Sequence, residues 1–249
     1  MKTKKIKFLG VVFTLLLGIS FTSCLNSDNN ESSWDIYAFV TVKNYMGSVY
    51  LLGDDGVTYY PTNPDVLKIT STGGATEYVE RAAIYLKYVD NAAGSTTTTR
   101  TVTIVSGNNI PVKSLCDKPD TIKTTVPLQS LNYNWGANGY ITVDFNFNYY
   151  SGTNFAFDLY PEAVQGDLLT LRLKQTYGKA NGNSLQEYLV SYKIPYFQSL
   201  QNQLENMGLG VLTPVQDSIY VTILGTGPNN TDLTVNGSNS KKKFRISID

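Results

Sequence analysis

The sequence predicts an all-β protein, in which a small barrel is followed by an antiparallel β-sandwich that contains one short helix. Most apolar residues occur in runs where they alternate with polar ones, which is the period of a strand with one buried face. Tyrosine is abundant, at 18 residues, and its aromatic ring suits the half-buried surface of a sheet. Only one stretch, 197–207, has apolar residues at helical spacing.

Residues 1–23 are predicted to be a lipoprotein signal peptide. Four lysines precede an uncharged run from Phe8 to Phe21, and small residues come directly before Cys24. A membrane-spanning helix needs about 20 apolar residues, and this run is shorter. We therefore expect Cys24 to be the lipid attachment site. The alternative is an ordinary signal peptide in which this cysteine is incidental.

Lipidation of Cys24 would hold the protein on a membrane through acyl chains, because several chains bind a bilayer far more stably than one. The next residue, Leu25, is not the aspartate that retains lipoproteins at the inner membrane. Residues 24–33 are polar and are expected to form a flexible tether. We expect an outer-membrane lipoprotein, either periplasmic or exposed at the cell surface, and the acidic residues Asp28 and Glu31 favour surface display.

Residues 34–116 are expected to form the barrel domain. Alternation runs through 36–43, and two apolar runs within 49–60 surround a Gly/Asp turn, which is a hairpin pattern. Further strands are expected over 81–88 and 98–105. Five strands in roughly 75 residues suit a small closed or nearly closed barrel.

Residues 117–130 contain two prolines and are expected to link the domains, and residues 131–249 are expected to form the sandwich. The strongest strand is 140–149, where apolar and polar residues alternate throughout. The helix expected over 197–207 has a proline ahead of it and a glycine after it. Other strands are expected over 155–160, 168–175, 187–194, 217–224 and 244–248.

Several segments of the chain together match the pattern of a known family. They are the Cys24 signal with its tether, 34–42, 50–61, 139–147 and 189–192. Through them the chain resembles the NigD-like lipoproteins of Bacteroidetes over most of its mature length. The resemblance implies an OB-like N-terminal barrel and a C-terminal β-sandwich, and it carries no settled activity. This chain departs from the family pattern over 196–214, where the helical segment lies between two sandwich strands.

The amino-acid content excludes several classes of function. Loss of the signal removes four lysines and leaves 16 basic and 20 acidic residues, a net charge of −4, which argues against nucleic acid binding. The absence of histidine excludes the usual serine-hydrolase triads and zinc sites. Cys116 would have no disulfide partner, and we interpret it as a small buried hydrophobic residue. We expect no cofactor, no metal site, no catalytic residue and no enzymatic activity.

Three carboxylates are candidate catalytic groups. Asp54 and Asp55 are adjacent in a turn, so their side chains should diverge, and Asp144 lies on the polar face of a strand. We expect all three to be exposed and not clustered. The alternative function is a carboxylate-dependent hydrolase acting on polysaccharide or another envelope polymer, and it would need two carboxylates at a defined separation.

The expected function is that of a lipid-anchored, non-catalytic binding or interaction module of the cell envelope, with a carbohydrate or a protein as its partner. OB-like barrels commonly bind sugars or nucleotides on one face. Tyrosines could stack on such a ligand, but they could also pack the barrel itself, which is the favoured interpretation. The tyrosines considered are Tyr37, Tyr59, Tyr60, Tyr85 and Tyr88.

Some short motifs have simpler explanations. The tripeptides 120–122 and 217–219 resemble the O-glycosylation signal of secreted Bacteroidetes proteins, and such tripeptides also arise by chance. Gly225-Thr226-Gly227 is followed by a proline and opens no helix, so it is not a dinucleotide loop. Lys241-Lys242-Lys243 is expected to be a solvated turn.

Overall fold

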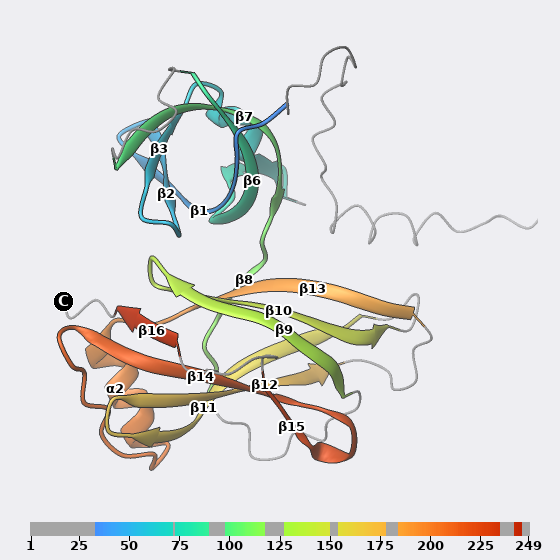
Figure 1. Ribbon diagram of the computed structural model, residues 1–249, viewed down its shortest axis with the longest axis vertical. Helices are drawn as coiled ribbons and strands as arrows, with labels where there is room; N and C mark the ends of the chain where they lie inside the picture. The colour runs from blue at the N-terminus through green and yellow to red at the C-terminus, as the bar shows by residue number, and fades with distance from the viewer. Residues whose placement is uncertain are drawn as a thin grey trace, which may run out of the picture. The chain divides into compact units, whose positions relative to one another are not determined.

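The computed structural model describes residues 33–71, 73–89, 98–117, 127–149, 154–177, 184–234 and 242–245 (Figure 1). The predicted signal peptide, Cys24 and the tripeptide 120–122 lie outside these residues. The chain divides into two compact units between Ile110 and Pro111.

The first unit is a closed five-stranded barrel with the strand order β1-β2-β3-β7-β6, which confirms the predicted small barrel (Figure 1). All neighbouring strands are antiparallel except β3 and β7, which run parallel, as the third and last strands do in an OB-like barrel. The barrel strands are β1 (Ile36–Tyr45), β2 (Ser48–Gly53), β3 (Thr58–Pro61), β6 (Arg81–Tyr88) and β7 (Thr99–Asn109).

The barrel core is formed by the inward-facing residues of these strands. Val40, Leu51, Tyr59 and Ile84 are fully buried there, so strand alternation sets one face of each strand against the core. The connection between β3 and β6 contains the short helix η1 and a two-stranded hairpin, and its Leu67 packs into the same core. The elements of this connection are η1 (Pro64–Leu67), β4 (Lys68–Thr70) and β5 (Thr76–Tyr78).

The second unit contains two sheets around one hydrophobic core. The first has the order β8-β13-β10-β9, and the second has the order β11-β12-β14-β15, with β16 also paired to β14 (Figure 1). Their strands are β8 (Val112–Ser114), β9 (Leu128–Ala137), β10 (Tyr140–Tyr149), β11 (Ala156–Gln165), β12 (Leu168–Tyr177), β13 (Ser184–Lys193), β14 (Ser218–Thr226), β15 (Asp232–Leu233) and β16 (Lys242–Arg245).

The sandwich differs from the sequence expectation in the direction of two strand pairs. β12 and β14 run parallel, and so do β8 and β13. The chain leaves β12, forms β13 in the opposite sheet and then a helix, and returns to β14, and such a long crossover permits parallel pairing. The remaining pairs are antiparallel.

Two further expectations from the sequence are corrected by the structure. β8 falls within the range 34–116 expected for the barrel, but it pairs with β13 and so belongs to the sandwich unit. The lysine run expected to form a turn instead contributes Lys242 and Lys243 to β16. Phe244 of this strand is buried in the sandwich core, and this burial accounts for the strand forming there.

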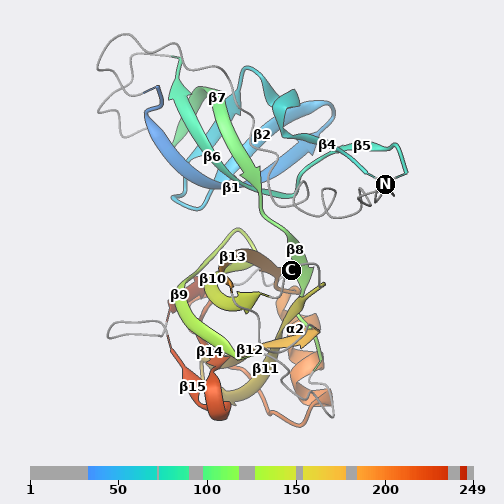
Figure 2. The same cartoon turned by 90° about the vertical axis from the view of Figure 1, so that its right-hand side faces the viewer.

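The predicted helix is confirmed as α2 (Phe197–Asn206), which flanks the sandwich sheets (Figure 2). Leu200 and Leu204 are fully buried in the sandwich core, so the helix packs through the apolar stripe seen in the sequence. Gly208 follows the helix with φ +69°, the left-handed conformation in which helices often end. A hydrogen bond holds the segment after the helix, because the Leu212 amide donates to Gln201 Oε1 at 3.0 Å.

Candidate functional site

Asp54 is not exposed, contrary to the expectation from the sequence. The Arg81 guanidinium donates to both of its oxygens, from Nη1 to Oδ1 at 2.7 Å and from Nη2 to Oδ2 at 2.6 Å. Arg81 also donates to Thr41 Oγ1 at 2.9 Å. The Arg81 side chain is fully buried and that of Asp54 is 9% exposed, because the buried cation needs a carboxylate beside it. Asp54 is therefore part of the barrel structure.

Asp55 is exposed, as expected, but its carboxylate is also engaged. Oδ1 accepts a hydrogen bond from the Val57 amide at 3.0 Å, and Oδ2 accepts one from the Tyr59 hydroxyl at 2.5 Å. Burial of Tyr59, together with the nearby Asp55 charge, raises the pKa of the tyrosine hydroxyl above its ordinary value. The adjacent carboxylates thus diverge onto separate partners, and both stabilise the turn.

Asp144 is half-buried and clustered, which also corrects the sequence expectation. Asn132 Nδ2 donates to Asp144 Oδ1 at 3.2 Å, and Ser130 Oγ donates to Asn132 Oδ1 at 2.6 Å. Glu187 lies on the neighbouring strand, close enough for its charge to act on Asp144. Burial raises the pKa of the Asp144 carboxyl, the hydrogen bond from Asn132 lowers it, and the nearby charge of Glu187 raises it.

Sequence reasoning missed Glu187 because it is 43 residues from Asp144. The strand register could have identified it. Asn146 pairs with Glu187 across β10 and β13, so Glu187 is a diagonal neighbour of Asp144 on the same sheet face. Diagonal neighbours of like charge on one sheet face repel each other. This arrangement alone does not identify a glycosidase pair, which needs two carboxyl groups at a defined separation.

The five barrel tyrosines divide into two groups. Tyr59 is buried inside the barrel, and Tyr88 packs partly against the same core, with Arg100 over its ring at 5.4 Å. These two fit the packing interpretation. Tyr37, Tyr60 and Tyr85 instead lie on outward-facing positions of their strands.

A row of outward-facing side chains crosses four barrel strands and is the candidate binding site. Lys43 on β1 pairs in register with Tyr50 on β2, and Tyr60 on β3 pairs in register with Thr101 on β7. The Tyr50 and Tyr60 rings join these halves, with centroids 6.4 Å apart and planes inclined by 36°. We name these four residues the barrel row. Tyr50 was not among the tyrosines singled out from the sequence, although its place in the hairpin pattern could have identified it.

The barrel row is accessible and carries one charge. Tyr60 is 50% exposed and Thr101 is exposed, whereas Tyr50 and Lys43 are half-buried. Tyr45, the last residue of β1 before the turn to β2, is 64% exposed. This surface can stack flat rings on tyrosine and can offer a hydroxyl and an ammonium group as hydrogen-bond donors.

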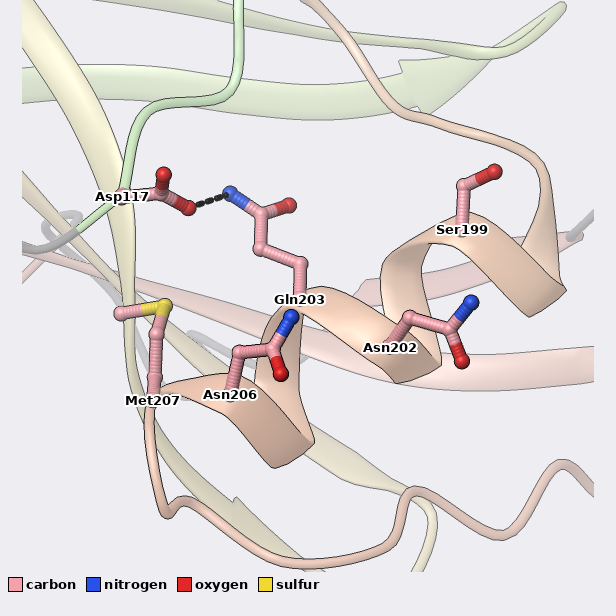
Figure 3. A pocket seen from close by; sticks show the side chains of 6 residues that line it. All are labelled: Asp117, Ser199, Asn202, Gln203, Asn206 and Met207. Atoms are coloured by element: carbon pink, nitrogen blue, oxygen red, sulfur yellow. Dashed lines mark hydrogen bonds between the residues drawn. The ribbon is translucent and has the colours of Figure 1, made fainter.

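A polar hollow of about 610 Å³ lies beside α2 in the sandwich unit (Figure 3). One of its walls is fixed by Gln203, whose Nε2 donates to Asp117 Oδ1 at 2.9 Å. The lining residues are Asp117, Ser199, Asn202, Gln203, Asn206 and Met207. The amide side chains on this face of the helix could be predicted from the sequence. Their approach to Asp117 could not, because it depends on where the fold places the segment after β8. The hollow offers hydrogen-bonding groups and lacks an aromatic ring.

The remaining predicted residues show no reactive site. Cys116 is half-buried rather than buried, and burial raises the pKa of its thiol, with a further contribution from the charge of Asp158. Ser218 in the tripeptide 217–219 is 8% exposed, and its hydroxyl donates to the Gln216 carbonyl at 3.2 Å, so folding leaves it a poor glycosylation acceptor. Gly225 and Thr226 are part of β14.

The described residues contain neither a metal-binding group nor a membrane-spanning helix. Within the ranges that the structure describes, histidine, cysteine, aspartate and glutamate form no group of three that could hold a metal ion. No helix in this part of the chain has the length and apolar character needed to cross a bilayer.

Comparisons with known proteins reveal similarity of fold. No protein-family model matches this chain, and no curated protein matches it either. A provisionally described toxin-related protein from Parabacteroides distasonis has a TM-score of 0.56 and 16% identity, covering 84% of this chain and 93% of that one. A provisionally described lipoprotein from Bacteroides fragilis has a TM-score of 0.53 and 14% identity, covering 84% of this chain and 97% of that one.

The structural neighbours also include a protein of the kind that the sequence motifs resemble. A NigD-like immunity protein from Bacteroides caccae has 18% identity and a TM-score of 0.47, and the alignment covers 86% of this chain and 98% of that one. The two structures with TM-scores above 0.5 establish the barrel-and-sandwich fold, and at their identities they assign no activity.

Proposed function

We propose that this protein is a non-catalytic binding module, held on the outer membrane by a lipid on Cys24, that binds a carbohydrate chain on the barrel row. The observation that carries the proposal is the contact between Tyr50 and Tyr60 on the outer face of β2 and β3. This is the face on which OB-like barrels bind oligosaccharides and oligonucleotides.

The chemistry of the barrel row suits a sugar. Tyr60 is half exposed and can stack on the apolar face of a pyranose ring, while Lys43 and Thr101 flank the two tyrosines in the sheet register. Donors on both sides of an aromatic ring can satisfy the hydroxyl groups of the sugar. An oligonucleotide would meet a mature chain of net charge −4, which opposes binding to phosphates.

Two observations support the lipid anchor. The sequence places Cys24 directly after a short apolar signal, and one protein of similar fold is provisionally described as a lipoprotein. An anchored module with a ligand-binding face would hold a glycan near the cell surface. The alternative, a carboxylate-dependent hydrolase, draws on one observation, which is that Asp144 and Glu187 are diagonal neighbours on the outer face of β10 and β13.

Binding to a library of bacterial and dietary oligosaccharides tests the barrel row. Tyr60→Ala and Tyr50→Ala should each weaken binding of any glycan that the wild-type protein retains, by about 1–3 kcal/mol if stacking on an aromatic ring resembles that measured for bases. Tyr220→Ala is a matched control, because Tyr220 is 41% exposed but lies on β14 in the other unit. Glycan binding that survives both tyrosine variants would refute the proposed site.

Hydrolysis of the same glycans, measured by release of reducing ends, separates the two functions. A non-catalytic module should release none. Turnover that disappears in Asp144→Asn or Glu187→Gln would support the hydrolase instead.

Membrane fractionation tests the anchor. Cys24→Ser should release the protein from the membrane fraction or leave the signal uncleaved, because the acyl chains have no other attachment point in the predicted signal. A variant that is processed and remains with the membranes as the wild type does would contradict lipidation at Cys24.

A further inference from the structure

A second group of aromatic side chains lies on the barrel, away from the barrel row, where the chain enters β1. The Trp34 ring is 4.9 Å from the Tyr85 ring, Tyr85 is 4.7 Å from Tyr37, and Tyr37 is 5.2 Å from Phe39, all between ring centroids. We name these four residues the entry patch. Trp34 is 39% exposed and Tyr37 is 43% exposed, whereas Phe39 and Tyr85 are half-buried.

Strand pairing explains why the entry patch forms. Tyr37 and Tyr85 are direct partners across β1 and β6, and alternation places Phe39 on the same outer face. Further along this face, Ala83 is 3% exposed and Arg81 is fully buried. The face is therefore covered at its Arg81 end and open at the end nearest the N-terminus.

The aromatic rings of the entry patch pack largely against one another. The planes of Trp34 and Tyr85 are inclined by 59°, those of Tyr37 and Phe39 by 73°, and those of Tyr37 and Tyr85 by 41°. A sugar needs a free, flat ring face for stacking, and this tilted cluster offers less of one than the barrel row. It offers instead a compact apolar surface whose tryptophan and tyrosines carry polar groups at their edges.

The position of the entry patch in the chain indicates its occupant. Trp34 is the first aromatic residue after Cys24 and lies ten residues beyond it. A chain of ten residues spans at most about 33–36 Å when fully extended. A lipid on Cys24 would thus hold the entry patch close to the bilayer surface throughout the life of the anchored protein.

We propose that the entry patch docks on the interfacial zone of the membrane that holds the lipid anchor, with Trp34 and Tyr37 among the lipid headgroups; this proposal rests on the proposed lipidation of Cys24. Tryptophan and tyrosine are enriched at this depth because their rings are apolar and their edges form hydrogen bonds. Lys87 is exposed on the same face of β6, two residues beyond Tyr85, and adds a positive charge suited to phosphate headgroups. Docking would fix the barrel against the membrane.

Tryptophan fluorescence provides a direct test, because the chain has only two tryptophans. In the Trp135→Phe variant, Trp34 is the sole reporter. The lipidated mature protein is reconstituted in vesicles of phosphatidylethanolamine and phosphatidylglycerol, with and without bromine on the acyl chains. Brominated lipid should quench Trp34, its emission should shift to shorter wavelength, and quenching by aqueous iodide should fall several-fold relative to the unanchored Cys24→Ser, Trp135→Phe protein.

A matched reporter controls for nonspecific proximity to the vesicle. Tyr60→Trp, in a chain that also carries Trp34→Phe and Trp135→Phe, places the only tryptophan on the barrel row. This reporter should remain open to iodide and should be quenched little by brominated lipid. Equal lipid quenching at both positions would refute docking through the entry patch.

The mass of the mature N-terminus separates the two proposals. An unmodified Cys24 would overturn both the lipid anchor and the docking that depends on it. A lipidated Cys24 combined with a Trp34 that stays as accessible to iodide as in the unanchored protein would overturn the docking alone. A Trp34 that stays accessible to iodide on the vesicle and becomes protected only when a glycan is added would identify the entry patch as a sugar site and refute the docking.

Discussion

Arg81 and Asp54 are joined by two parallel hydrogen bonds of 2.7 and 2.6 Å, although 27 residues separate them in the chain. Asp54 lies in the turn after β2 and Arg81 is the first residue of β6, so the pair ties two parts of the barrel that are not adjacent in sequence. The guanidinium is fully buried, and the carboxylate that faces it is the counter-charge. The same Asp54 was expected from the sequence to be a solvated turn residue.

Asp54→Asn should destabilise the barrel by about 3–5 kcal/mol, because it leaves a buried guanidinium without its carboxylate. The free energy of unfolding from urea titration measures the loss. Replacing both partners with apolar residues, Asp54→Leu with Arg81→Met, should cost less than the single change, since no charge then remains buried. A double variant as unstable as the sum of its single variants would contradict this account.

An exposed pair supplies the control. Lys68 and Asp65 form an ion pair at 2.8 Å on the barrel surface, where water solvates both groups. Asp65→Asn should change stability little compared with Asp54→Asn.

The sequence predicted the strands well because alternation records which face of a strand is buried. The run from Ile141 to Phe147 shows this directly, since its four alternating apolar residues are all buried in the sandwich core. The helix was also predictable, because Leu200 and Leu204 lie one turn apart on its buried face. These are local patterns.

Features that depend on pairing between distant segments could not be predicted from the sequence. The parallel pair β12–β14 and the three-residue strand β8 leave no local signature, since strand direction follows from the chain's crossover. The burial of Arg81 could not be predicted for a similar reason. A charged residue at the start of a strand is expected to be exposed, and only the folded chain brings Asp54 beside it. The barrel row likewise needed the register that joins Tyr50 to Tyr60.

The sandwich should lose stability above about pH 10 through Tyr192. Its hydroxyl donates to the Phe157 carbonyl at 2.9 Å, and burial raises its pKa well above the ordinary value. The unfolded tyrosine loses its proton near pH 10 while the folded one keeps it, so unfolding becomes more favourable as pH rises, by about 1.4 kcal/mol per pH unit. Below pH 10 this contribution to stability is fully present.

Tyr192→Phe isolates this effect. The variant should be about 0.5–1.5 kcal/mol less stable at pH 7, because it lacks the hydrogen bond, and its stability should fall less steeply between pH 10 and 11. Urea titrations at several pH values measure both quantities. Parallel pH profiles for the wild type and Tyr192→Phe would exclude Tyr192 as a source of the alkaline loss.

Asp144→Asn should stabilise the sandwich at pH 7 and have less effect at pH 3. The raised pKa of Asp144 means that the folded state binds its proton more tightly than the unfolded state, so that stabilisation is complete at low pH and is lost as pH rises through the folded pKa. Asparagine removes the charge that opposes Glu187 and keeps an oxygen to accept from Asn132. A gain of about 0.2–1 kcal/mol at pH 7 is typical of relieving a like-charge contact across strands.

Glu187→Gln is the companion variant. It should stabilise the protein at pH 7 as Asp144→Asn does, and the double variant should gain less than the sum of the two, because each change alone relieves the same repulsion. Additive gains would indicate that the two carboxyls do not interact.

β8 falls within the range expected from the sequence for the barrel domain, but it pairs with β13 in the sandwich unit. We expect the fragment 111–249 to be more stable than the fragment 117–249, because only the longer one keeps β8 beside β13. The Ser191 amide donates to the Pro111 carbonyl at 2.9 Å, and Lys113 Nζ contacts Asp158 Oδ1 at 3.0 Å. Leu115 is buried in the sandwich core, and burying a leucine contributes about 1.5–3 kcal/mol.

Urea unfolding of the two sandwich fragments measures the difference, and the barrel fragments 34–110 and 34–116 are its control. The six additional residues should raise the unfolding midpoint of the sandwich fragment and leave that of the barrel fragment unchanged, because within the described residues β8 forms its ladder with β13. If the extension stabilised the barrel fragment instead, β8 would belong to the barrel. Its pairing with β13 would then contribute nothing to the stability of the sandwich.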